Sequence, residues 1–170
     1  MLMNMKIIKE LEDLQGEMQE WRRDIHAHPE IAFEEHRTAQ IVADKLESFG
    51  IEVETGIAGT GVVGTLRKGM GNRSIGLRAD LDALLINETN DFEYKSKNPG
   101  QMHACGHDGH TTMLLGAAKY LSEQGNFDGT VNFIFQPAEE NEGGGRVMIE
   151  DGLFDKYPVE SVYGMHNIPG

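Results

Sequence analysis

The spacing of apolar residues changes near residue 50 of the 170-residue chain, and this change limits the folds that the chain can adopt. Before that point, apolar residues recur every three or four positions, which predicts helices. After it, short apolar runs are separated by glycine-rich turns, which is typical of strands. The same criteria, applied to the whole chain, predict helices over 6–27, 34–49, 111–122 and 143–149 and strands over 51–54, 61–66, 74–79, 129–136 and 159–165.

The order of these elements indicates the fold class. Helices and strands alternate over much of the chain, and such alternation favours an α/β fold in which helices cover a sheet. We therefore expect a mixed, largely parallel sheet with helices on both faces. The polar segment 86–101 is predicted to be a loop, and no repeat or domain linker is visible.

Charge and composition exclude several classes of function. The formal net charge is -13, and the Lys and Arg residues are scattered, which argues against a nucleic-acid-binding surface. No apolar run is long enough to span a bilayer, so a membrane protein is not expected. Residues 1–10 lack the apolar stretch of a secretory signal, and the chain has a single cysteine. Together these features predict a reducing, cytoplasmic location.

The segment 102–110, Met-His-Ala-Cys-Gly-His-Asp-Gly-His, is the densest group of potential metal ligands. Its Cys105 has no other cysteine in the chain to pair with, so an internal disulfide cannot explain it. Thiolate and imidazole groups are ligands that a zinc-like ion accepts, and Cys105 and His107 are predicted to bind one. The structural alternatives are an inert buried cysteine and ordinary hydrogen-bonded histidines.

Other residues of the motif are interpreted structurally. His103 and His110 are expected to be hydrogen-bonded histidines, because four protein ligands already saturate a zinc-like ion. Asp108 is expected to cap the helix that follows, although it could instead bind metal or accept a hydrogen bond from an imidazole. His26 and His28 are predicted to be structural residues at the end of the first helix.

Further candidate groups follow the predicted strands. Asp80 and Asp82 follow one strand, the pair Glu139-Glu140 follows another, and His166 follows the last. Ligands of open α/β sheets bind outside the carboxyl ends of strands, so we expect these groups to meet. Adjacent acids point in different directions, so one of the pair could bind metal while the other takes a proton from water. Asp80 and Asp82 either orient an imidazole ligand or pair with Arg78 or a helix N-terminus.

Five stretches, in order, resemble the zinc-type metallopeptidase family that includes aminoacylases and carboxypeptidases. The nearest branch contains the amidohydrolases that cleave N-acyl amino acids, such as hippurate hydrolases, N-acetyl-diaminopimelate deacetylases and auxin-conjugate hydrolases. The resemblance implies the catalytic fold of the zinc exopeptidases. The stretches are residues 22–30, 77–84, 102–110, 136–140 and 164–170.

The resemblance also implies roles for individual residues. It makes Glu139 the general base and Asp82 the supporting acid, while Asp80 stands where more distant relatives carry a histidine ligand. Leu85 departs from the proline that is usual in the family. The resemblance further implies a pair of divalent ions, which could be manganese, zinc, cobalt or nickel. The four side chains implied as their ligands are Cys105, His107, Glu140 and His166.

The expected function is metal-dependent hydrolysis of the amide bond of small N-acyl amino acids. The ion lowers the pKa of a bound water towards about 7, and Glu139 removes the proton as the water attacks the carbonyl. Residues 1–170 are expected to form the amino-terminal part of the catalytic domain, without the lid and dimerisation domain of the family. The sequence leaves open whether the chain forms a homo-oligomer. The alternatives are a non-catalytic metal-binding fragment or assembly component, and a hydrolase with Cys105 as nucleophile.

Overall fold

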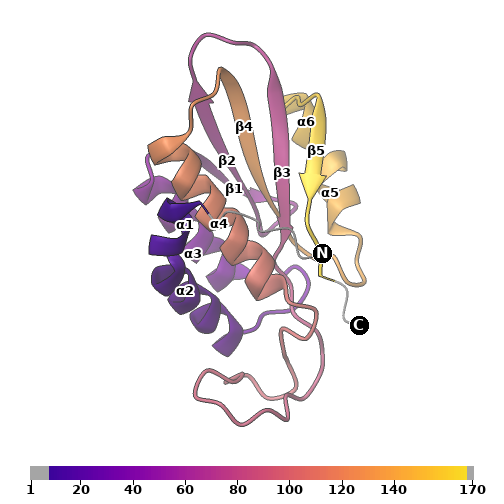
Figure 1. Ribbon diagram of the computed structural model, residues 1–170. Helices are drawn as coiled ribbons and strands as arrows, with labels where there is room; N and C mark the ends of the chain where they lie inside the picture. Colours follow the sequence, from indigo (N-terminus) through magenta and orange to yellow (C-terminus); the bar gives the residue numbers. More distant parts are fainter. Residues whose placement is uncertain (1–7, 168–170) are drawn as a thin grey trace, which may run out of the picture.

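The computed structural model describes residues 8–167 (Figure 1). Residues 6 and 7 of the first predicted helix and residues 168–170 of the last motif lie outside the described residues. The helices are α1 Lys9–Asp13, α2 Gln15–Ala27, α3 His36–Ser48, α4 His107–Gln124, α5 Gly144–Glu150 and α6 Leu153–Lys156. The strands are β1 Glu52–Ile57, β2 Gly61–Lys68, β3 Ser74–Asp80, β4 Gly129–Gln136 and β5 Ser161–Gly164.

The strands form one five-stranded sheet in the order β1-β2-β4-β3-β5. β3 pairs in parallel with β4 and with β5, whereas β2 pairs antiparallel with β1 and with β4. The sheet is therefore mixed, as predicted, but it is not largely parallel, because two of its pairs are parallel and two are antiparallel. Because β3, β4 and β5 run in one direction, their carboxyl ends lie at the same end of the sheet, and β5 forms one edge of it (Figure 1).

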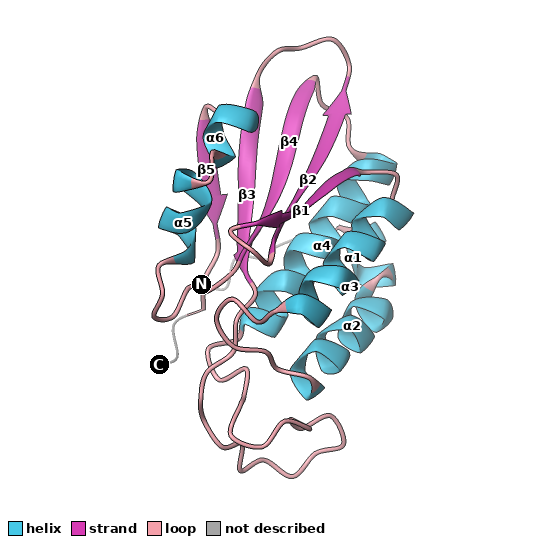
Figure 2. Ribbon diagram, turned by 180° about the vertical axis from the view of Figure 1, so that it is seen from behind, coloured by secondary structure: helices cyan, strands magenta, loops and turns pink. Residues whose placement is uncertain are grey.

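Helices cover both faces of the sheet, as the alternation of elements predicts (Figure 2). Successive strand residues point to opposite faces. Phe133 packs in the core beneath α1–α4, while its neighbour Ile134 packs with Met148 of α5 in a second, smaller core. Phe133 is fully buried, and β4 is buried along nearly its whole length. The strand β4 is thus packed against apolar side chains on both faces of the sheet, which holds it rigidly.

Several boundaries differ from the sequence prediction by one to four residues, and the start of α4 differs most. α4 begins at His107 instead of residue 111, because Gly106 takes a left-handed conformation (φ 90°) that allows a sharp entry into the helix. The predicted helix 6–27 is divided at Leu14 into α1 and α2. The short helix α6 is not predicted, and the loop predicted over 86–101 is confirmed.

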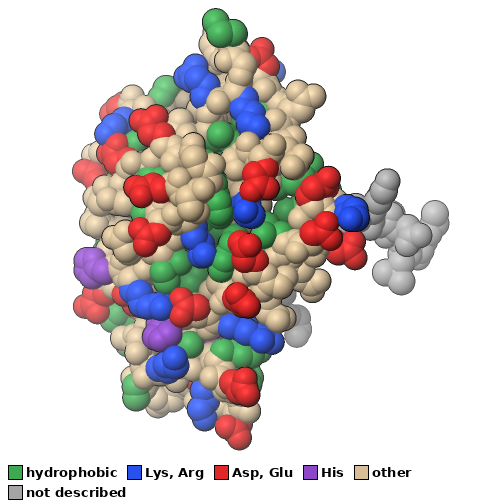
Figure 3. Space-filling model, turned by 90° about the vertical axis from the view of Figure 1, so that its left-hand side faces the viewer, with side chains coloured by type: hydrophobic (Ala, Val, Ile, Leu, Met, Phe, Trp, Pro, Cys, Tyr) green, Lys and Arg blue, Asp and Glu red, His purple; other side chains and the backbone are tan. Residues whose placement is uncertain are grey.

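The surface of the helical layer is mixed in charge. Acidic and basic side chains are interspersed on the face that Figure 3 shows. In the described part of the chain, no helix combines the length and the apolarity that a bilayer crossing needs.

Candidate functional site

The predicted site residues gather at the carboxyl ends of the parallel strands. Asp80 is the last residue of β3, and Glu139 and Glu140 lie in the turn after β4. His166 follows β5, and His107 is the first residue of α4. The structure therefore brings together groups that are up to 86 positions apart in the chain, from Asp80 to His166.

The four predicted ligands fall into two overlapping groups that share His107. The ligand atoms of Cys105, His107 and Glu140 all lie within 4.8 Å of one another, and those of His107 and His166 do as well. Cys105 Sγ is 3.5 Å from His166 Nε2, and His107 Nε2 is 3.6 Å from Glu140 Oε1. Tetrahedral ligands that are about 2.0–2.3 Å from an ion lie about 3.3–3.8 Å from one another. The donor set of thiol, imidazoles and carboxylate also suits a borderline-soft divalent ion.

The environment of His107 gives an independent reason for a cation. Its Nδ1 lies 2.8 Å from the Asp82 carbonyl oxygen and 3.2 Å from Asp82 Oδ1, and because both are acceptors, Nδ1 carries a hydrogen. Its Nε2 is buried without a hydrogen-bond partner among residues 8–167. Carboxylate oxygens of Asp80, Glu140 and Glu139 surround Nε2 at 3.7, 3.6 and 3.8 Å. A nitrogen lone pair that faces three carboxylates is unfavourable unless a proton or a metal ion lies between them.

Asp82 and His107 form a buried pair beside these groups. Burial opposes ionisation of Asp82, but hydrogen bonds from His107 and from the backbone N–H groups of Glu139 and Glu140 outweigh it and lower the pKa of Asp82. For His107, burial acts to lower the pKa, and the Asp82 hydrogen bond with the charges of Asp80, Asp82 and Glu140 raises it overall. An ionised Asp82 holds the imidazole with Nε2 towards the other carboxylates, which is the geometry expected of a supporting acid.

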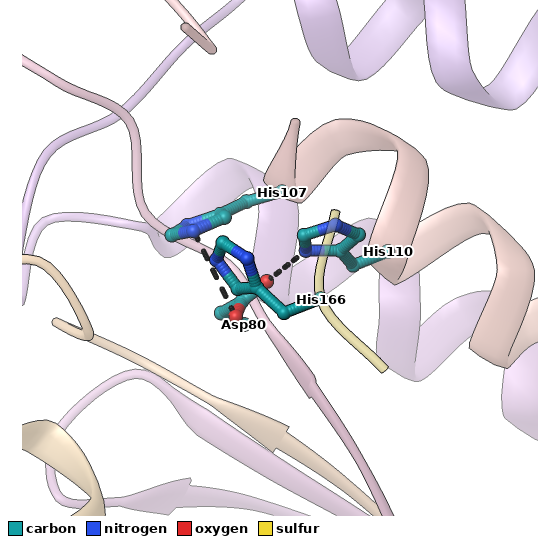
Figure 4. A group of neighbouring side chains, drawn as sticks. All are labelled: Asp80, His107, His110 and His166. Carbon is teal, nitrogen blue, oxygen red and sulfur yellow. Dashed lines mark hydrogen bonds and ion pairs between the residues drawn. The ribbon is translucent and has the colours of Figure 1, made fainter. Parts of the chain in front are cut away.

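A second group contains Asp80, His107, His110 and His166, whose ligand atoms also lie within 4.8 Å of one another (Figure 4). His110 Nδ1 is 2.7 Å from Asp80 Oδ1, and His110 Nε2 accepts the Asn167 N–H at 3.2 Å. Both ring nitrogens of His110 thus have partners, so the prediction of a hydrogen-bonded histidine is confirmed. Arg78 donates to Asp80 Oδ2 at 2.7 Å, which is the pairing that the structural interpretation of Asp80 required.

Cys105 lies in a negative environment. Burial raises the pKa of its thiol to about 12, and the neighbouring Glu140, Glu139 and Asp80 add to the effect. A free thiol in this setting stays protonated at neutral pH, whereas coordination to a cation favours the thiolate.

Asp108 and His103 differ from their predicted roles. The N-cap of α4 is Gly106, and no side chain caps this end, so the prediction of Asp108 as a cap is wrong. Asp108 Oδ2 instead accepts from Arg22 Nε at 3.1 Å and pairs with His26 Nδ1 at 2.9 Å, so the imidazole-acceptor alternative holds. His103 is buried, and neither of its ring nitrogens has a hydrogen-bond partner in the described part of the chain, which contradicts the prediction for it. Burial lowers the pKa of His103 to about 4, so the ring is neutral near pH 7.

His26 is a buried structural residue at the end of α2, as predicted, and it bridges two carboxylates. Its second ring nitrogen, Nε2, lies 3.0 Å from Glu88 Oε1 in the loop 86–101. The neighbouring His28 is partly exposed, and its Nδ1 lies 2.8 Å from the backbone oxygen of Asp24.

Glu35 contacts the site from outside the predicted set. Its carboxylate is fully buried and reaches the backbone of Ala138, which immediately precedes Glu139. Glu35 follows Glu34 at the start of a helix, and adjacent acids at such a position are typically exposed. The local sequence therefore gives no indication of this buried contact.

Comparisons with known proteins agree with the fold and identify a family. Residues 76–170 match the sequence model of Peptidase family M20/M25/M40. The chain is 56% identical over 165 residues to a hippurate hydrolase of Campylobacter jejuni, an alignment that covers 97% of this chain and 43% of the relative. It is 48% identical over 148 residues to an N-acyl-L-amino acid amidohydrolase of Geobacillus stearothermophilus, covering 86% of this chain and 40% of the relative.

The structural comparison leads to the same family. A dinuclear metal binding peptidase from the M20 family of Bacillus subtilis superposes with a TM-score of 0.87 at 39% identity, over 93% of this chain and 44% of that chain. The chain thus spans about two fifths of the length of the curated relatives that it matches. The family model covers more than half of the chain, and the long alignments agree with it. The chain therefore belongs to Peptidase family M20/M25/M40.

Proposed function

We propose that the chain is the amino-terminal part of the catalytic domain of a metal-dependent amidohydrolase that cleaves N-acyl amino acids. The observation that carries this proposal is the group of Cys105, His107 and Glu140 at one end of the sheet, with His166 beside Cys105 and with His107 Nε2 facing carboxylates. The relatives named hippurate hydrolase and N-acyl-L-amino acid amidohydrolase support the substrate class.

The four clustered side chains would hold the ion, and Asp82 would orient His107 through its Nδ1 hydrogen. A bound divalent cation would supply Lewis-acid activation of water and of the amide carbonyl. The Bacillus subtilis neighbour described as dinuclear supports a pair of ions, with manganese, zinc, cobalt and nickel as the candidates. A reducing cytoplasm is part of the proposal, because Cys105 must stay a thiol to bind an ion.

Glu139 is the proposed general base. Its Oε2 lies 3.8 Å from His107 Nε2, at the border of the cluster, and about one third of its side chain is exposed. From this position it can take a proton from the water that adds to the amide carbonyl. The C–N bond then breaks, and Glu139 gives the proton to the departing amine, which leaves a carboxylic acid and a free amino acid.

The test is the variant Glu139→Gln, assayed for release of glycine from N-benzoylglycine with Zn²⁺ or Mn²⁺ added. Loss of a general base lowers turnover by about 100- to 10,000-fold, while Zn²⁺ affinity should change little. Glu142→Gln, at an exposed position of the same loop, is the matched control and should behave as wild type. Wild-type turnover in Glu139→Gln would remove Glu139 as the base.

A non-catalytic metal-binding role is the second candidate, because a group of ligand-type side chains can bind an ion without any turnover. Zinc binding by the wild-type chain without any turnover of N-acyl amino acids would favour it. Turnover that a chelator abolishes would exclude it.

A cysteine nucleophile is the third candidate, since Cys105 Sγ lies 3.5 Å from His166 Nε2. The raised pKa of the thiol, about 12, opposes this role. Activity in a preparation shown to contain no metal would support it.

A further inference from the structure

Glu35 is a buried carboxylate that the proposed reaction does not use. It occupies the N-cap position of α3, yet its side chain makes no capping hydrogen bond to that helix. Its two oxygens instead point to other segments: Oε2 accepts the Thr60 hydroxyl at 2.5 Å, and Oε1 accepts the Ala138 N–H at 2.9 Å. Burial of a carboxylate is costly, so these two contacts need a reason beyond helix capping.

Ala138 has an unusual backbone. Its φ of 50° is in the left-handed region, which residues other than glycine rarely adopt. It is fully buried and lies directly before Glu139 and Glu140. A residue in this conformation persists only when its surroundings hold it there, and such residues occur mostly at functional sites.

Three contacts hold the turn that contains Ala138. Glu35 accepts from the Ala138 N–H, and the Ala138 carbonyl accepts from the Gly144 N–H at 2.9 Å. The Glu140 N–H donates to Asp82 Oδ2 at 3.1 Å. The Glu35 contact is the one that acts on the left-handed residue from a segment more than 100 positions away.

We propose that Glu35 is a positioning residue that fixes the backbone of Ala138 and thereby directs Glu139 and Glu140 into the site. The inference rests on the proposed function for the roles of these two acids. It does not require Glu35 to touch substrate or metal, and it assigns a purpose to a buried carboxyl group that lies outside the ligand groups.

Two substitutions of similar size distinguish the effect of the hydrogen bond from the effect of the volume that the side chain fills. Glu35→Gln keeps an acceptor for the Ala138 N–H, and it resembles the neutral form of the carboxyl, which burial favours by raising the pKa of Glu35. Glu35→Met fills the same volume without an acceptor. Glu34→Gln changes the neighbouring, exposed acid and is the control.

The readouts are Zn²⁺ affinity of the metal-free chain, by competition with a chromophoric chelator, and hydrogen exchange of the Ala138 amide by NMR. We expect Glu35→Met to weaken Zn²⁺ binding by about 10- to 100-fold, as loss of an outer partner of a ligand does. Exchange at Ala138 should accelerate in the same variant. Glu35→Gln and Glu34→Gln should stay within about threefold of wild type in both measurements.

Equal Zn²⁺ affinity and equal Ala138 exchange in Glu35→Met and Glu35→Gln would overturn the proposal. If Glu35→Met does not fold, the wild-type chain decides: an Ala138 amide that exchanges at the rate of an exposed amide refutes the anchoring contact, and strong protection supports it. The exchange measurement does not depend on catalysis. Failure of Glu139 as the base would therefore be distinguishable from failure of Glu35 as the anchor.

Discussion

The turn after β4 approaches α5 so closely that a single added methyl group should disrupt it. A Cβ at Gly144 would overlap the carbonyl oxygen of Pro137 and would lie 2.7 Å from its carbonyl carbon, where ordinary contact begins at 3.4 Å. Gly144→Ala must therefore separate the two segments by at least about 0.7 Å, the difference between these distances. Overpacking of this kind costs about 1–3 kcal/mol of unfolding free energy.

The same displacement acts on Glu139 and Glu140, which lie between Pro137 and Gly144. Misplacement of a catalytic group by about 1 Å can lower the reaction rate by about 100-fold. A shift of this size in Glu139 or Glu140 should therefore reduce its contribution to catalysis or to metal binding. We expect Gly144→Ala to lower the melting temperature by about 2–12 °C, at about 2–4 °C per kcal/mol for a chain of this length. We also expect Zn²⁺ affinity to fall by about 10-fold or more.

The control substitution, Gly16→Ala, should change the stability in the opposite direction. Gly16 lies in α2, and a Cβ there would meet nothing within 4 Å, so Gly16→Ala should stabilise the helix by up to about 1 kcal/mol. Thermal melts followed by circular dichroism, with and without Zn²⁺, measure both variants. If Gly144→Ala melts at the wild-type temperature and binds Zn²⁺ as wild type, the close approach that we describe is not a constraint on the site.

Two further predictions concern metal and pH. Zn²⁺ at about 100 times its Kd should stabilise the chain by about 2.7 kcal/mol in chemical unfolding, and both EDTA and His107→Ala should abolish the gain. The hydrogen bond to Asp108 raises the pKa of His26, burial opposes this, and Glu88 adds to the rise, so the folded pKa exceeds the unfolded one. The stability from His26 is therefore fully present below about pH 6.5 and is lost as the pH rises through the folded pKa. The excess in unfolding free energy of wild type over His26→Gln should therefore shrink as the pH rises over this range.

The parts of the fold that sequence predicts well are those set by continuous burial. The strand β4 was predictable at both ends because residues 129–136 form a run that is buried on both faces and ends at Pro137. The start of α4 was not predictable, because His107, Asp108 and His110 are polar and hide the apolar periodicity of the helix. Their burial results from contacts with distant segments, such as the pairing of His110 with Asp80.

The composition of the site was visible in the sequence, but the arrangement that supports it was not. Residue types and strand ends were enough to select Cys105, His107 and the pair Glu139-Glu140 as candidates, and their roles as ligands and base stay predictions. The anchoring of the turn by Glu35 depends on a left-handed Ala138, and no rule of local sequence predicts such a conformation for alanine.

The strand β5 is an exposed edge strand of the sheet. Among residues 8–167, β3 is its only hydrogen-bonded neighbour, and Val162 and Tyr163 are exposed along it. An unpaired border of this kind accepts another strand readily. A segment that joins β5 would lie alongside the backbone that leads to His166, so any extension of the sheet would also place new side chains next to the imidazole that faces Cys105.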